Sequence, residues 1–242
     1  DDSILVRSNL GGLGGRCDTE ALADLCTTGV RTTNTERSVY VERIAMTDGA
    51  QVDLRITNQS EYRAWNVKVN GIKRQGQGFA TGYYGAINLL APRLATVADQ
   101  SWHTDSTWVQ LRYEFVRHVP GLSGGPIALD RTFVTFYDFD GAINNERASE
   151  CMLFRSSEAH NIQTLSDTAD GVSELTMFNA TDLSGAFRGA VPAFSDARWL
   201  EEPAYCAGAF GVGADNPVNP TNLSYLQRSR SVMIELQGAS HF

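Results

Sequence analysis

Asp138 and Asp140 are two carboxylates that stand two residues apart at the end of a segment rich in β-branched and aromatic residues, residues 132–140. In a β-strand this spacing puts both side chains on one face of the sheet, beside apolar neighbours. Two like charges in that setting repel each other and lose hydration, and both penalties fall when they share a hard cation. We therefore predict a calcium site with the ligands Asp138, Asp140, Asn144 and Glu146. The alternative is that the strand leaves the core at residue 138 and that both carboxylates are hydrated in a turn.

Residues 121–125, Gly-Leu-Ser-Gly-Gly, fit the G-x-S-x-G pattern, and with the following proline they resemble the Gly-Asp-Ser-Gly-Gly-Pro stretch of chymotrypsin-like proteases. Leu122 stands where that family has an aspartate. The upstream histidines, His103 and His118, are only 20 and 5 residues before Ser123. The next segment reads as a strand, whereas an α/β-hydrolase needs a helix there. We interpret the segment as a glycine-rich loop between strands, predict no catalytic residue, and keep a serine hydrolase as the third functional hypothesis.

Aromatic residues cluster at Tyr83–Tyr84, Trp102–Trp108 and Tyr113–Phe115. Exposed aromatic rings stack on sugars in many β-sandwich modules, although we expect most of these rings in the core. Together with Asp138 and Asp140, they support a second functional hypothesis, a calcium-assisted carbohydrate-binding module of lectin type that binds glycans.

The chain has four cysteines and no C-x-x-C pair, so the common zinc and thioredoxin spacings are absent; the cysteines are Cys17, Cys26, Cys151 and Cys206. We predict two disulfides, Cys17–Cys26 around a helical turn at residues 19–25 and Cys151–Cys206 between distant parts of the sheet region. The alternative is four buried free thiols.

Three sequons predict N-glycosylation at Asn58, Asn179 and Asn222, although such triplets also arise by chance in a chain rich in serine and threonine. The first residue is Asp1 rather than methionine, which suggests that a targeting segment was removed or that the chain was trimmed. With the expected disulfides, these features predict a secreted protein that is extracellular or at the cell surface.

The charge balance and the apolar runs exclude two broad classes of function. Among 242 residues, 28 are acidic and 20 are basic, and the only lysines are Lys68 and Lys73. The chain therefore lacks the cationic surface that nucleic-acid binding needs. Apolar runs such as residues 86–91 are far shorter than the ~20 residues of a membrane-spanning helix, so we expect no membrane insertion.

Alternation of apolar and polar residues predicts many short strands. Residues 39–45 and 52–57 are expected to be two strands of a β-hairpin, joined by a turn at residues 47–49. The alternation in the second strand directs Asp53 and Arg55 towards solvent. Further expected strands are residues 1–9, 65–69, 86–90, 108–116, 132–140, 151–154, 175–179 and 231–236. This pattern predicts an all-β fold, a β-sandwich or jelly roll with long loops and one short helical turn near the N-terminus. We expect an N-terminal segment, residues 1–30, and a single sandwich domain, residues 31–242.

Residues 133–140, Phe-Val-Thr-Phe-Tyr-Asp-Phe-Asp, followed by residues 146–154, resemble the F-x-F-x-D-x-D segment of uncharacterised secreted β-sandwich proteins in algae, protists and bacteria. The resemblance covers a small part of the chain. It implies an extracellular domain stabilised by calcium, and no catalytic residue is carried over from it.

These observations favour a non-enzymatic, secreted structural glycoprotein that assembles with copies of itself into a filament, sheet or coat. No catalytic set of residues has the required spacing, and the edges of a sandwich invite strand addition. The N-terminal strand, residues 3–8, is bounded by glycines and is expected to pair with a neighbouring subunit. Calcium is the one cofactor that we predict.

Overall fold

The computed structural model describes part of the chain as two compact units. The first unit comprises Asp1–Leu90, Thr107–Asp130 and Gly238–Phe242, and the second comprises Ala91–Ser106 and Arg131–Gln237. The described residues are 4–10, 37–62, 64, 71–74, 83–89, 109–120, 122–139, 150–164, 173–179, 202–208 and 223–242. They form sheets of five, three, three and two strands, which confirms the predicted all-β fold.

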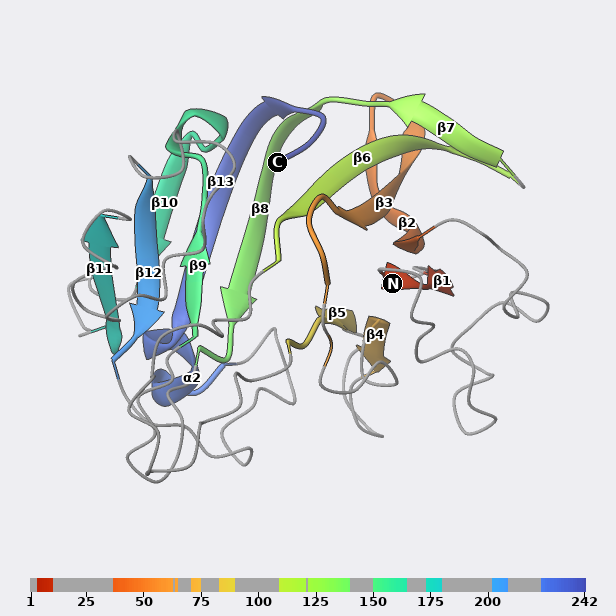
Figure 1. Ribbon diagram of the computed structural model, residues 1–242. Coiled ribbons are helices and arrows are strands. Elements are labelled where there is room, and N and C mark those ends of the chain that lie inside the picture. The colour runs from red at the N-terminus through yellow and green to blue at the C-terminus, as the bar shows by residue number, and fades with distance from the viewer. Residues whose placement is uncertain are drawn as a thin grey trace. The chain divides into compact units, whose positions relative to one another are not determined.

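The five-stranded sheet of the first unit has the strand order β1-β2-β3-β6-β7 (Figure 1). Its strands are β1 (Ile4–Ser8), β2 (Ser38–Thr47), β3 (Ala50–Asn58), β6 (Leu111–Val119) and β7 (Leu122–Pro126). Neighbouring strands pair antiparallel, and residues 240–242 continue alongside β6. A separate two-stranded sheet contains β4 (Gly71–Arg74) and β5 (Tyr83–Ala86). In the large sheet, β6 is therefore bordered by β3 on one edge and by β7 and the chain end on the other.

The hairpin of β2 and β3 forms where the sequence predicts it. Asp48 and Gly49 have φ angles of +47° and +74°, as the two central residues of a type I′ turn require. Glycine adopts this conformation without steric penalty, and aspartate tolerates it better than most residues. The predicted strands 39–45 and 52–57 and the turn between them are confirmed.

The apolar face of the large sheet forms the core of the first unit. Its buried residues are Leu10, Val39, Val41, Ile56 and Tyr62. Tyr62 satisfies its hydroxyl by donating to the carbonyl oxygen of Asn88 at 2.6 Å. Burial of each large side chain of this kind contributes roughly 1.5–3 kcal/mol, so this face holds the sheet together and the opposite face can carry polar groups.

The second unit is built around two three-stranded sheets, with the orders β10-β13-β8 and β11-β12-β9. The strands are β8 (Leu129–Tyr137), β9 (Cys151–Leu153), β10 (Asn161–Thr164), β11 (Leu175–Asn179), β12 (Pro203–Ala207) and β13 (Ser231–Ala239). On one face of β13, Val232, Ile234 and Leu236 are fully buried. Two short helices, η5 (Ser156–Glu158) and α2 (Tyr225–Ser229), accompany the sheets.

Several strand predictions need correction. The expected strand 132–140 is β8, which ends at Tyr137, and Asp138 follows it with a φ angle of +74°. The glycines of residues 121–125 favour a loop, but residues 122–126 form β7. β10 and β12 were missed because their sequences, Asn-Ile-Gln-Thr and Pro-Ala-Tyr-Cys-Ala, have too few alternating positions to signal a strand.

Other predictions concern residues outside the described part of the chain. The helical turn at residues 19–25 and the strand at residues 65–69 lie there. The division into residues 1–30 and 31–242 stays a prediction. Within the described residues, the structure has no helix with both the length and the apolar character needed to cross a membrane.

Candidate functional site

The face of the large sheet opposite the core carries a row of polar side chains. The strand register places four residues of neighbouring strands in one line, Arg7, Tyr40, Arg55 and Glu114. Directly opposed residues share a face and interact across the sheet. Arg7, Tyr40 and Glu114 are buried, so these polar groups must satisfy one another.

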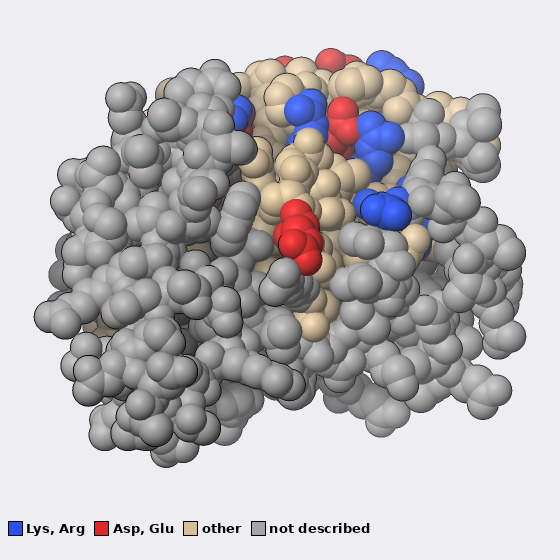
Figure 2. All heavy atoms as spheres, viewed as in Figure 1, with Lys and Arg blue, Asp and Glu red and all other residues tan. Residues whose placement is uncertain are grey.

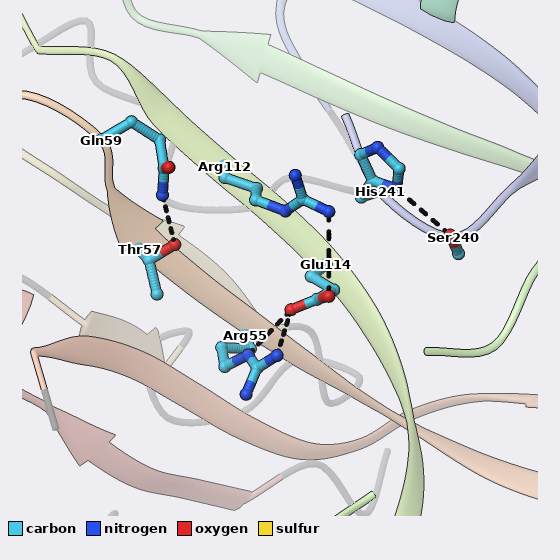
Figure 3. A network of polar contacts seen from close by, with 7 residues as sticks. All are labelled: Arg55, Thr57, Gln59, Arg112, Glu114, Ser240 and His241. Atoms are coloured by element: carbon cyan, nitrogen blue, oxygen red, sulfur yellow. Dashed lines mark hydrogen bonds and ion pairs between the residues drawn. The ribbon is translucent and has the colours of Figure 1, made fainter. Parts of the chain in front are cut away.

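Glu114 is neutralised by arginines from two strands, as Figure 3 shows. Nε of Arg55 donates to Oε2 of Glu114 at 2.9 Å, and Nη2 of Arg55 donates to the same oxygen. Nη2 of Arg112 lies 3.9 Å from Oε1 of Glu114. In the space-filling view, basic and acidic side chains lie next to one another in the region of β3 and β6 (Figure 2). This part of the site is therefore a compensated ion cluster.

The chain end is fixed beside this cluster. Tyr113 and Phe242 exchange two backbone hydrogen bonds of 2.8 and 2.9 Å, and their rings stack with centroids 4.7 Å apart. His241 forms a β-bridge with Glu114, and the Ser240 hydroxyl lies 3.2 Å from Nδ1 of His241. The last three residues therefore act as an additional short strand on β6.

Asp53 lies at the centre of a second polar group on the same face. The sequence predicted that this side chain faces solvent, but Asp53 is completely buried. Its carboxylate accepts hydrogen bonds from the Tyr40 hydroxyl at 2.7 Å and from the Arg43 amide at 2.9 Å. The pairing of β2 with β3 is irregular between Val41 and Ala45, and Arg43 has a φ angle of +60°. This bulge brings an additional backbone donor to the carboxylate, which is why a charge at this position can be buried.

Tyr40 links Asp53 to the far edge of the sheet. Burial, followed by the hydrogen bond to Asp53, raises the pKa of the Tyr40 hydroxyl well above its ordinary value, so the hydroxyl remains a donor. The Arg7 guanidinium carbon lies 5.3 Å from the centre of the Tyr40 ring, and Nε of Arg7 donates to the Ser38 hydroxyl at 2.9 Å. The ring and carboxylate are thus held in one orientation.

His118 completes the group around Asp53. Its Nδ1 lies 3.0 Å from Oδ1 and 3.1 Å from Oδ2 of Asp53, and the imidazole is largely buried. When Nδ1 carries the proton, it donates to the carboxylate, and Nε2 is left as a base. An imidazole oriented by a carboxylate is the arrangement that general base catalysis uses. We name Tyr40, Arg43, Asp53 and His118 the Asp53 cluster.

Sequence reasoning did not find this site, although one signal was present. Asp53 and Arg55 occupy the polar positions of one alternating strand, and Arg112 and Glu114 occupy those of another. An alternating pattern assigns such residues to the face away from the core. It does not show that the two strands are neighbours, and this neighbourhood creates the cluster.

The predicted calcium ligands are only partly described. Asp138 is half-buried and lies beyond the end of β8, so the reason for placing it on a strand face with Asp140 is wrong. Asp140, Asn144 and Glu146 lie outside the described residues. Among the residues that the structure describes, no group of three or more His, Cys, Asp or Glu side chains could hold a metal ion. Calcium binding stays a prediction.

The sequons differ in what the structure shows of them. Asn58 is the last residue of β3, and its Nδ2 donates to the carbonyl oxygen of Ser60 at 2.7 Å. Asn179 is the last residue of β11, and Asn222 lies outside the described part of the chain. A glycan on Asn58 would replace a hydrogen of the nitrogen that makes this bond.

The predicted disulfide Cys151–Cys206 is confirmed. The two residues are directly opposite each other in the pairing of β9 with β12, and their Cα atoms are 4.1 Å apart. The sequence separation of 55 residues makes this bond a link between distant segments. Cys17 and Cys26 lie outside the described residues, so their pairing stays a prediction.

The outer edge of β11 is the clearest candidate for strand addition. β11 is a terminal strand, and no strand of the described chain pairs with its outer edge. The Gly208 amide donates to the Glu174 carbonyl oxygen at 2.8 Å, so these two residues are a hydrogen-bonded pair. Along β11 and β12, hydrogen-bonded pairs alternate with pairs that are not hydrogen-bonded to each other. By that alternation, the peptide N–H and C=O of Met177 point away from β12. The Met177 side chain is 66% exposed.

The edges of the large sheet are less suited to pairing. β7 contains Pro126, which has no N–H to donate, and β1 has an irregular register between Leu5 and Arg7. β1, which we predicted to pair with a neighbouring subunit, pairs with β2 of its own chain along one edge. The sequence of β11, Leu-Thr-Met-Phe-Asn, contains no charge, proline or glycine.

Comparisons of the chain with protein-family models, with curated proteins and with solved structures find no match. The resemblance of residues 133–140 to secreted β-sandwich proteins therefore stays untested. Within that segment, Phe133 and Phe136 are three residues apart, which departs from the F-x-F spacing of the pattern.

Proposed function

We propose that this chain is an extracellular structural domain that assembles with copies of itself through the outer edge of β11. The observation that carries the proposal is an uncharged terminal strand with outward peptide groups at Met177 and a Met177 side chain that is 66% exposed. Natural sheets usually protect such edges with charges, prolines or bulges. An edge without these devices is suited to pairing with a second copy of the same strand.

The disulfide supports both parts of the proposal. Disulfides persist mainly in oxidising compartments, which agrees with a location outside the cell. Cys206 lies on β12, the strand that holds β11, and its partner Cys151 lies on β9. The covalent bond therefore fixes the sheet to which β11 belongs, so that the outer edge of β11 is a rigid template.

The test compares two single variants. One adds a charge at the outer edge of β11, and the other adds a charge at an equally exposed methionine elsewhere. Met177→Lys puts a cation on β11, and Met46→Lys puts one on β2, where the side chain is 62% exposed. The protein is produced in a host without N-glycosylation, so that Asn179 is unmodified. Size is measured by sedimentation velocity over a range of concentrations, and particles are examined by electron microscopy.

We expect the wild type and Met46→Lys to form the same assemblies and Met177→Lys to remain monomeric. A wild-type protein that is monomeric at about 0.5 mM, a concentration above the Kd of most specific complexes, would overturn the proposal. Assembly of Met177→Lys equal to that of the wild type would do so as well.

A second candidate function, glycan binding, is favoured by Phe133. This side chain is 48% exposed on β8, and the Arg131 guanidinium carbon lies 4.9 Å from the centre of its ring. Nε of Arg131 also donates to Oε1 of Glu235 at 2.6 Å. An exposed ring beside fixed polar groups is a surface on which a sugar ring can stack.

Glycan binding is tested with Phe133→Ala and the control Tyr225→Ala, because Tyr225 is 50% exposed on α2. We expect glycan-array signals of the wild type to disappear in Phe133→Ala and to persist in Tyr225→Ala. Loss of the signals on chelation would add calcium to the binding site. An array without wild-type signals removes this candidate.

A further inference from the structure

The three-stranded sheet β10-β13-β8, visible in Figure 1, carries the Glu235 carboxylate on its central strand. The Glu235 side chain is only 7% exposed. Nε of Arg131 donates to Oε1 at 2.6 Å, and Nε2 of Gln237 donates to the same oxygen at 3.4 Å. The described residues donate no hydrogen bond to Oε2, and this atom is not closed to solvent. Glu235 therefore keeps an acceptor that is available to a ligand.

Arg131 supplies hydrogen-bond donors on the same surface. Its side chain is 62% exposed, and among the described residues only Glu235 accepts a hydrogen bond from it. That bond uses Nε, so the N–H groups of Nη1 and Nη2 are available as further donors. The guanidinium carbon lies 4.9 Å from the centre of the Phe133 ring, which is exposed on the same strand. Polar donors and an apolar ring thus lie side by side.

Asn161 adds an amide on the other side of Glu235. The two residues are directly opposite each other in the pairing of β10 with β13. Directly opposed residues share a face of the sheet, with Cβ atoms about 4.5–5.5 Å apart. Asn161 is exposed, and an amide side chain offers both a donor and an acceptor. The Glu235 carboxylate is therefore bordered by a guanidinium from β8 and by an amide from β10.

We propose that these four side chains bind a neutral sugar through two adjacent hydroxyl groups; the residues are Arg131, Phe133, Asn161 and Glu235. One hydroxyl donates to Oε2 of Glu235, and its neighbour accepts from the Arg131 guanidinium. The C–H face of the sugar ring packs on Phe133. The inference rests on the second candidate function, glycan binding, and adds the ligand class and the groups that select it.

The charges of the site favour a neutral sugar over a sugar acid. The hydrogen bond from Arg131 holds the pKa of the Glu235 carboxyl below its ordinary value, so this carboxyl is ionised at neutral pH. The opposite charges of Arg131 and Glu235 compensate each other, and the pair leaves no net positive charge for a second carboxylate. A sugar acid would be repelled by Glu235. A hydroxyl donates to Oε2 without bringing a further charge.

The test measures binding of methyl glycosides to the full chain by NMR titration. The probes are the methyl glycosides of glucose, galactose and mannose, each compared with its matched uronic acid. We expect at least one neutral glycoside to bind and its uronic acid to bind about 10-fold more weakly or not at all. Monodeoxy analogues of the bound glycoside then identify the two hydroxyls. Removal of either should raise the Kd about 10-fold, because a polar group of the site is left without its partner.

Two variants separate ligand binding from folding. Glu235→Gln keeps the size of the side chain and removes its charge, so we expect the Kd to rise about 10-fold or more. Asn161→Ala removes the amide at an exposed position and should raise the Kd about 3-fold or more. Gln51→Ala is the matched control, because Gln51 is an exposed amide on β3, and it should bind as the wild type does. Circular dichroism verifies that each variant is folded.

Three outcomes would overturn the inference. They are a preference for the uronic acids, an unchanged Kd in folded Glu235→Gln, and no binding of any neutral glycoside at about 20 mM, well above a Kd of about 1 mM. Binding that disappears in Phe133→Ala and is unchanged in Glu235→Gln would leave glycan binding in place and remove Glu235 as the selecting group. Failure of the inference is in this way distinguished from failure of the candidate function.

Discussion

Tyr40 and Asp53 are diagonal neighbours in the pairing of β2 with β3, and the Tyr40 hydroxyl donates to Oδ2 of Asp53 at 2.7 Å. Tyr40 is directly opposite Arg55, two residues beyond Asp53 on the same face. The long tyrosine side chain spans this diagonal. A completely buried carboxylate is therefore held by a tyrosine and a backbone amide from β2 and by a histidine from β6.

This dependence predicts a large effect of Asp53→Ala on stability. The variant leaves the Tyr40 hydroxyl and the Arg43 amide without their acceptor in a site closed to water. We expect the free energy of unfolding, measured by urea denaturation, to fall by about 2–4 kcal/mol. Asp130→Ala is the control, because Asp130 is exposed on β8, and it should change stability by less than about 0.5 kcal/mol. Equal effects of the two variants would contradict the role of the Asp53 cluster.

Two adjacent glycines of β7 are predicted to differ in their tolerance of alanine. At Gly124 the added Cβ would overlap the Arg117 carbonyl oxygen, whereas at Gly125 it meets no atom within 4 Å. We expect Gly124→Ala to destabilise the protein by about 3 kcal/mol and Gly125→Ala to change it by less than about 1 kcal/mol. The melting temperatures of the two variants measure this difference. A Gly124→Ala variant as stable as Gly125→Ala would show that β6 and β7 do not approach as closely as described.

The Cys151–Cys206 disulfide is predicted to stabilise the second unit. It closes a loop across 55 residues, for which the chain-entropy estimate is about 4 kcal/mol. The double variant Cys151→Ala/Cys206→Ala should therefore have a lower urea midpoint than the wild type. Dithiothreitol should lower the wild-type midpoint towards that of the variant. An unchanged midpoint of the variant would contradict a structural role for this bond.

The ion pair between Arg131 and Glu235 predicts a dependence of stability on pH. The hydrogen bond from Arg131 holds the pKa of the Glu235 carboxyl below its ordinary value of 4.5. A carboxyl whose pKa is lowered by folding stabilises the folded state above pH 4.5, and this contribution is lost as the pH falls through the folded pKa. Glu235→Gln should therefore lose less stability than the wild type between pH 6 and pH 3, measured by urea denaturation. Equal losses would show that Glu235 does not contribute to the acid sensitivity.

Local features of the sequence were sufficient for much of the fold. The alternation in residues 52–57 and the turn at Asp48-Gly49 predicted the β2–β3 hairpin, because side-chain direction in a strand and left-handed turn conformations are set by neighbouring residues. β11 was predicted with its observed bounds, and the Cys151–Cys206 pair was predicted among the possible cysteine pairings. Strands without clear alternation, such as β10 and β12, left no comparable signal.

Only the tertiary structure determined the candidate sites. The alternation of residues 52–57 predicts that Asp53 faces solvent. The burial of Asp53 depends on a bulge in β2 and on His118 from β6. The contact of His118 with Asp53 and the position of β11 at a sheet edge depend on strand order and register. Alternation specifies which face a residue occupies. It does not specify which strands become neighbours, since that choice follows from packing and hydrogen bonding between segments far apart in the chain.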